Sequence, residues 1–227
     1  MHIYAFGSIC RGDLLEGSDI DLLALVDGYD SRFDPDMFSV YSYSRISDLW
    51  VEGNPFAWHL FLESRLIFAS DEHDFLRSLG SPAHYSNCVK DCEKFYSVFK
   101  AARKSLLKQQ ATKVFELSTI FLSIRNIATC FSLGTTRNPD FSRHSALRLK
   151  SNSVPLPQDV YSVIERARIL STRGEGKDIS RSEVDLVRNK LEIVENWMER
   201  LIGEARAHER ISKPHGSPTA NSAVGKS

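Results

Sequence analysis

The sequence predicts an α+β fold, in which a mixed sheet with short helices is followed by an α-helical bundle. Up to Ser70, short apolar runs alternate with turn residues, a pattern typical of strands and short helices. From about Asp71 onward, apolar residues recur with the period of an amphipathic helix. After about Ala205 the composition changes to His, Lys, Ser, Pro and Gly, which favours a disordered tail. We therefore expect three parts, which are residues 1–70, 71–204 and 205–227.

Four strands are predicted in the first part, because short apolar runs there end at turn residues. They cover residues 3–6, 20–26, 38–43 and 65–69. Between the third and fourth strands, residues 44–53 predict a short helix that ends at Gly53. Asn54-Pro55 then restarts the chain into residues 56–63.

The second part predicts a bundle of amphipathic helices. The clearest helical period runs from Val114 to Phe131, and we expect Gly134 to end this helix. A polar loop with Pro139 follows, and a further helix opens at Pro157, since proline suits the first turn of a helix.

The last predicted helix begins at a capping box. Ser180 is followed three residues later by Glu183, and this spacing lets the two residues satisfy each other's backbone N–H groups. An apolar stripe then continues to Leu201, so we expect one helix over this segment.

The composition is that of a soluble globular protein, with 42% hydrophobic and 26% charged residues. Lys plus Arg equals Asp plus Glu at 29 each, so no overall positive field draws the molecule to nucleic acid. The first residues carry no basic leader, and no run is apolar over the about 18 residues of a membrane span. We expect a cytoplasmic protein without membrane contact, its four cysteines reduced.

Gly7 and Ser8 stand where the first predicted strand ends. Glycine allows a tight turn and the close approach of a phosphate, and the Ser8 hydroxyl and nearby amides can donate hydrogen bonds to phosphate oxygens. A Gly-Ser pair after a strand is common, however, and by itself indicates no more than a turn.

Asp19 and Asp21 open the second predicted strand, ten residues after Ser8. Residues two apart on a strand point to the same face, so both carboxylates project together. Two like charges side by side repel each other unless a cation lies between them. Because carboxylate oxygens suit Mg²⁺, the pair predicts a magnesium site.

Taken together, Gly7-Ser8, Asp19 and Asp21, with Arg11-Gly12-Asp13 between them, resemble the signature of the polymerase-beta-type nucleotidyltransferase superfamily. The resemblance is closest to its small bacterial members and the aminoglycoside nucleotidyltransferases. It implies a nucleotidyltransferase-type sheet and the transfer of a nucleoside monophosphate from a nucleoside triphosphate, ATP being the expected donor, to an acceptor hydroxyl. Pyrophosphate leaves. Asp19 and Asp21 would hold Mg²⁺ and carry catalysis, and Gly7, Ser8 and Arg11 would bind the nucleotide.

Active members of this superfamily usually have a third carboxylate on a following strand, and residues 38–43 contain no acid. Asp36 and Glu63 are the nearest substitutes, and Glu116 in the helical part is a further one. His59 stands among aromatic residues and is expected in the core or at the rim of the cleft.

Several alternatives therefore stay open. The helical part resembles the substrate-binding bundles attached to these enzymes, but the acceptor can be an aminoglycoside, another small alcohol, a protein side chain or an RNA end. A homodimer also stays open. The chain can instead be a catalytically weakened nucleotide-binding or antitoxin-like regulatory module. An RNA acceptor would draw on a basic stretch made of Lys100, Arg103, Lys104 and Lys108.

Overall fold

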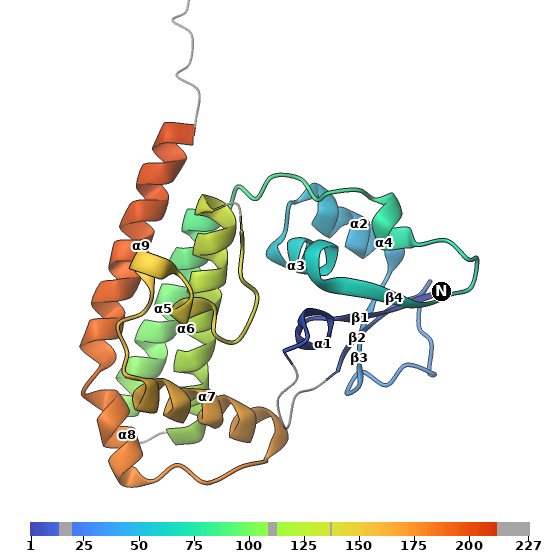
Figure 1. Ribbon diagram of the computed structural model, residues 1–227. Helices are drawn as coiled ribbons and strands as arrows, with labels where there is room; N and C mark the ends of the chain where they lie inside the picture. The colour runs from blue at the N-terminus through green and yellow to red at the C-terminus, as the bar shows by residue number, and fades with distance from the viewer. Residues whose placement is uncertain (14–19, 109–112, 137, 213–227) are drawn as a thin grey trace, which may run out of the picture.

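The computed structural model describes residues 1–13, 20–108, 113–136 and 138–212. Figure 1 shows a sheet with its short helices beside a bundle of longer helices, and an extended segment after residue 78 joins them. This arrangement confirms the predicted α+β fold, with the mixed sheet first and the bundle second.

The sheet has four described strands in the order β3-β2-β1-β4. Their bounds are β1 His2–Phe6, β2 Asp21–Leu25, β3 Phe38–Tyr41 and β4 Ser64–Ala69. β1 runs antiparallel to both β2 and β4, whereas β2 and β3 are parallel. The register pairs Phe6 with Asp21 on one side and with Ser64 on the other. The turn after β1 and the start of β2 therefore lie at the same end of the sheet.

Short helices surround this sheet. They are α1 Ser8–Arg11, α2 Tyr43–Val51, α3 Pro55–Glu63 and α4 Phe75–Ser78. Side chains of α2 and α3 pack on β1 and β2 in one apolar cluster that includes Tyr4, Leu23 and Trp50. The Ser42 and Asn54 side chains accept hydrogen bonds from the first turns of α2 and α3, which explains where these helices begin.

The bundle is built around one central helix. Its elements are α5 Cys88–Leu107, α6 Lys113–Thr135, the 3₁₀ turns η1 Ser145–Leu147 and η2 Lys150–Asn152, α7 Gln158–Arg173, α8 Arg181–Arg188 and α9 Leu191–Ser212. α6 packs against α5, α7 and α9. Phe99, Ile124 and Tyr161 lie in its core and are fully buried. Leu76 of α4, which follows the predicted domain boundary at Ser70, packs with the apolar cluster of the sheet and not with the bundle. The boundary itself stays a prediction.

Helix α6 is long and apolar enough to cross a membrane by length and composition, although the sequence was expected to hold no such stretch. Within this structure 67% of its apolar window is buried. Packing against the neighbouring helices accounts for this apolar character, and the absence of membrane contact stays a prediction.

Gly134 does not end α6 as predicted, because the helix continues to Thr135. A Cβ added at Gly134 would lie 2.5 Å from both Cβ and Sγ of Cys88. The glycine therefore allows α5 to approach α6 closely. In the sequence alone, a glycine with this packing role has the same appearance as a glycine that ends a helix.

The prediction of one helix from Ser180 to Leu201 is also wrong. The capping box of Ser180 and Glu183 is present and begins α8, but this helix ends at Arg188 and α9 begins at Leu191. The break follows from packing, since α8 packs against α7 whereas α9 packs against α5 and α6.

The predicted disordered tail begins too early. α9 extends to Ser212, so residues 205–212 are helical, and residues 213–227 lie outside the part of the chain that the structure describes. Ala205 is buried, Arg206 pairs with Glu93 at 2.6 Å, and Glu209 accepts a hydrogen bond from the Val89 N–H at 3.4 Å. These contacts with α5 hold the additional turns of α9.

Candidate functional site

The turn after β1 brings a glycine against a carboxylate. Gly7 has φ 76° and ψ −135°, a backbone conformation that residues with a Cβ rarely adopt. Its N–H donates to the carbonyl oxygen of Glu63 at 3.0 Å, and its carbonyl accepts from Cys10 and Arg11. A Cβ at this position would lie 2.7 Å from Oδ2 of Asp21. Both the backbone and the neighbouring carboxylate therefore require glycine.

Asp21 is the first residue of β2 and is exposed. The antiparallel register with Phe6 places it beside the turn, so the structure brings Gly7, Ser8 and Asp21 together. Asp19, the other predicted carboxylate, lies outside the described residues.

Arg11 ends the short helix α1 and forms two ion pairs. Its Nε lies 2.9 Å from Oδ2 of Asp13, and its Nη1 pairs with Oε2 of Glu63. Burial lowers the pKa of Arg11, but the hydrogen bonds and charges of Asp13 and Glu63 outweigh this and raise it overall. Arg11 is therefore held as a cation at the edge of the turn.

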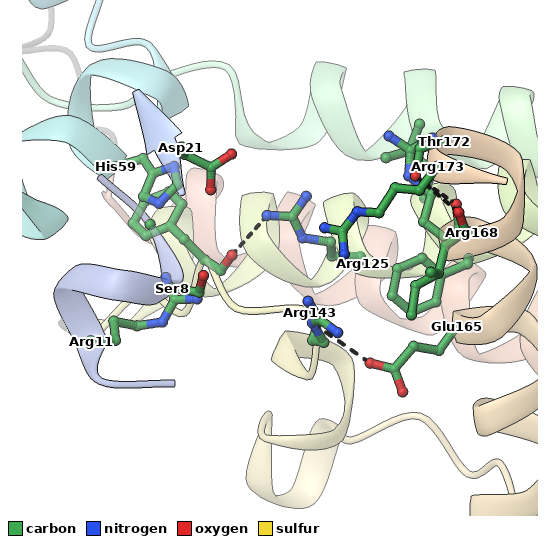
Figure 2. A pocket seen from close by; sticks show the side chains of 15 residues that line it. Ser8, Arg11, Asp21, His59, Arg125, Arg143, Glu165, Arg168, Thr172 and Arg173 are labelled. Carbon is green, nitrogen blue, oxygen red and sulfur yellow. Dashed lines mark hydrogen bonds and ion pairs between the residues drawn. The ribbon is translucent and has the colours of Figure 1, made fainter. Parts of the chain in front are cut away.

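A cleft of about 940 Å³, including the part open to solvent, lies between the sheet and the bundle (Figure 2). The part that water-sized molecules can occupy is about 260 Å³, slightly below the about 300–1,000 Å³ of small-molecule sites. Five of its lining residues are arginines and two are carboxylates. The sheet side supplies Gly7, Ser8, Arg11, Asp21 and His59, and the helical side supplies Phe121, Leu122, Arg125, Phe141, Arg143, Glu165, Arg168, Ile169, Thr172 and Arg173.

Arg125 of α6 lies at the centre of this cleft. Its Nη2 donates to the carbonyl oxygen of Phe141 at 2.8 Å, whereas its Nε is buried and makes no hydrogen bond to any described residue. Burial lowers the pKa of Arg125, and the charges of Arg11 and Arg168 lower it further while that of Asp21 raises it. A buried cation with spare donors is suited to an anionic ligand.

Glu165 of α7 is the second carboxylate that lines the cleft. Its Oε1 lies 3.2 Å from Nε2 of His144 and 3.8 Å from Nε of Arg143. Sequence reasoning missed it, although Glu165, Arg168 and Thr172 have helical spacing on the face opposite the apolar stripe of α7. That stripe of polar residues was the available signal.

The substitutes for a third carboxylate lie elsewhere. Glu63 pairs with Arg11 and its Oε2 lies 3.0 Å from Nε2 of His59. Glu116 is buried on α6, and Asp36 is exposed before β3. None of these three acids lines the cleft, whereas His59 does, stacked on Phe141 with ring centroids 4.8 Å apart.

The predicted basic stretch on α5 is also separate from the cleft. Lys100, Arg103, Lys104 and Lys108 line a different hollow. Arg103 there forms an ion pair with Glu195 of α9.

Comparison with known proteins agrees with this geometry. Residues 2–90 match the family model described as a nucleotidyltransferase domain, and these residues include the turn at Gly7 and Asp21. A search of curated proteins found no match. Residues 2–90 therefore match a nucleotidyltransferase domain, in agreement with the predicted resemblance to the polymerase-beta-type superfamily.

Proposed function

We propose that the protein transfers a nucleoside monophosphate from a nucleoside triphosphate, with ATP as the expected donor, to an acceptor hydroxyl and releases pyrophosphate. The observation that carries this proposal is the contact between Gly7 and the Asp21 carboxylate at the mouth of an arginine-lined cleft. The family match over residues 2–90 supports nucleotidyl transfer in general.

The phosphates of the donor are assigned to the turn at Gly7 and Ser8. The Ser8 hydroxyl donates to phosphate oxygens, and Arg125 faces this turn from the helical side (Figure 2). Arg11 adds positive charge at the edge of the same turn. Cations placed where negative charge develops on the leaving pyrophosphate stabilise the transition state.

The residues present fit a magnesium ion. The Asp21 carboxylate is exposed at the cleft and adjoins the phosphate turn, and carboxylate oxygens are the ligands that Mg²⁺ prefers. Asp21 would hold the ion together with Asp19, two residues earlier in the chain. Bound Mg²⁺ would neutralise charge on the phosphates during transfer.

Glu165 is assigned to the acceptor side of the cleft. It lies across the cleft from Ser8 and Asp21 (Figure 2), where its carboxylate can accept the proton of the attacking hydroxyl. His144 and Arg143 position it. This assignment provides the carboxylate that the strand after Asp21 lacks.

Release of pyrophosphate from ATP in the presence of Mg²⁺ tests both assignments. We expect Asp21→Asn and Glu165→Gln each to lower turnover by at least about 100-fold, since each removes a group that acts on the reacting atoms. Asp36→Asn is the matched control, because Asp36 is an exposed acid away from the cleft. Unchanged turnover in Asp21→Asn would refute the assigned site, and unchanged turnover in Glu165→Gln would refute its role as base.

A second function is a catalytically weakened nucleotide-binding or regulatory module of the same fold. It is favoured by one observation, which is that the strand after β2, β3 Phe38–Tyr41, contains no acid. Calorimetry that detects binding of MgATP, together with no pyrophosphate release over a broad panel of acceptors, would select this function. We also propose a cytoplasmic location and a homodimer.

A further inference from the structure

The two walls of the cleft differ in how their charges are balanced. On the sheet wall, Arg11 pairs with Asp13 and Glu63, so its charge is neutralised within the protein. On the helical wall, among the residues that the structure describes, Arg125, Arg143 and Arg168 face a single carboxylate, Glu165.

Arg168 shows this imbalance most clearly. It is partly buried on α7, and its guanidinium forms no ion pair or hydrogen bond with residues in the described ranges. Burial lowers its pKa, as expected for a cation that lacks a nearby carboxylate. Placing an unpaired charge in such a site costs free energy unless a ligand of opposite charge binds there.

The position of Arg168 separates it from the donor phosphates. In Figure 2, Arg125 lies between Arg168 and the side chains of Ser8 and Asp21. Arg125 is thus the guanidinium of the helical wall that faces the phosphate turn, and Arg168 lies beyond it on the wall that Arg143 and Glu165 also line.

The chemistry of this wall selects among acceptors. A cationic amino sugar would be repelled by the guanidinium groups, so the wall is unsuited to an aminoglycoside. A phosphate monoester carries a charge of about −1.5 to −2 at pH 7 and three acceptor oxygens, which match the donors of planar guanidinium groups. A carboxylate offers only one negative charge and two oxygens.

We propose that the acceptor is a small molecule that carries a phosphate group, which Arg168 binds together with Arg143, next to the hydroxyl that receives the nucleotide. This inference rests on the proposed nucleotidyl transfer, because it concerns the second substrate of that reaction. The anion site itself does not depend on turnover, so the two can be tested apart.

Calorimetry on the full chain tests the site. The protein is first saturated with a non-hydrolysable ATP analogue and Mg²⁺, and inorganic phosphate is then titrated. We expect Arg168→Gln to weaken phosphate binding by at least about 10-fold, since a charge-assisted hydrogen bond is lost, and to change the affinity for the analogue less than about twofold. Arg181→Gln is the matched control, because Arg181 is exposed on α8 and does not line the cleft.

Two results would overturn the proposal. One is equal phosphate affinity in Arg168→Gln and the unmodified protein. The other is an equal loss of analogue and phosphate binding in Arg168→Gln, which would place Arg168 in the donor site. If instead Asp21→Asn leaves MgATP turnover unchanged while Arg168-dependent phosphate binding persists, the proposed catalytic site fails and the anion site stands.

The same titration identifies the chemistry of the acceptor. We expect ribose 5-phosphate to bind more tightly than acetate and than the aminoglycoside kanamycin. Tighter binding of kanamycin or of acetate would overturn the assignment of a phosphate. Tighter binding of a short RNA than of ribose 5-phosphate would overturn the assignment of a small acceptor.

Discussion

The substitution Gly7→Ala tests how the turn and Asp21 depend on each other. Alanine at φ 76° and ψ −135° adopts a conformation that costs on the order of 1–3 kcal/mol. Its Cβ would also meet Oδ2 of Asp21 at 2.7 Å, which forces the carboxylate from its rotamer at a cost of about 0.5–1.5 kcal/mol. We therefore expect a loss of roughly 2–4 kcal/mol in stability, and a displaced Asp21 carboxylate.

Gly12→Ala is a control for positive φ alone, since Gly12 has ψ 12° and Gly7 has ψ −135°. Gly12 also has φ 76°, but a Cβ there has nothing within 4 Å, so we expect a loss of only about 1–2 kcal/mol. Thermal unfolding should show the difference, since each 1 kcal/mol shifts Tm by about 2–4 °C in a chain of this size. Pyrophosphate release should also fall much further in Gly7→Ala than in Gly12→Ala.

A double-mutant cycle isolates the collision with the carboxylate. Asp21→Ala removes the colliding oxygen, so in that background Gly7→Ala should cost only the free energy of the backbone conformation. If Gly7→Ala costs the same free energy with and without Asp21, or costs no more than Gly12→Ala, the close approach of Asp21 to the turn is wrong.

Three further predictions concern stability alone. Gly134→Ala should lower stability by about 1–3 kcal/mol, because its Cβ would lie 2.5 Å from both Cβ and Sγ of Cys88, and Cys88→Ala should relieve only the part of this cost that comes from Sγ. Gly203→Ala in α9, where a Cβ meets nothing within 4 Å, should instead stabilise the protein by roughly 0.5–1 kcal/mol. Thermal unfolding measures both variants, and a change in Tm of the same sign in both would contradict the packing argument. The hydrogen bonds from Ser180 and Arg166 lower the pKa of Glu183 to about 2. The stability from this carboxylate is therefore present above its ordinary pKa of about 4.3 and is lost as the pH falls toward 2, a loss that Ser180→Ala should reduce in acid-unfolding curves.

The strands and the phosphate turn could be predicted because their signals are local. The apolar runs end at turn residues, and Gly7, Ser8 and Asp21 are brought together by the pairing of two strands that follow each other in the chain. The capping box at Ser180 is equally local, because both partners lie within one helical turn. Such features need no knowledge of the rest of the fold.

The errors arise where a distant contact decides the structure. Gly134 has the composition of a helix stop, but Cys88 on another helix determines its role. The apolar stripe from Val184 to Leu201 is continuous in the sequence, yet its two parts pack against different helices. Glu165 and Arg168 resemble an ordinary solvated helix face until the fold places them opposite Asp21.

A chain of contacts explains why the helical wall of the cleft is the least predictable part of the site. Arg11 pairs with Glu63, which lies beside His59, and His59 stacks on Phe141 of the loop after α6. The carbonyl oxygen of Phe141 accepts a hydrogen bond from Arg125. These contacts join the phosphate turn to the helical wall through residues from four separate segments. The relative placement of the two walls is therefore set by tertiary packing, and the identity of the acceptor depends on that placement more than on any motif.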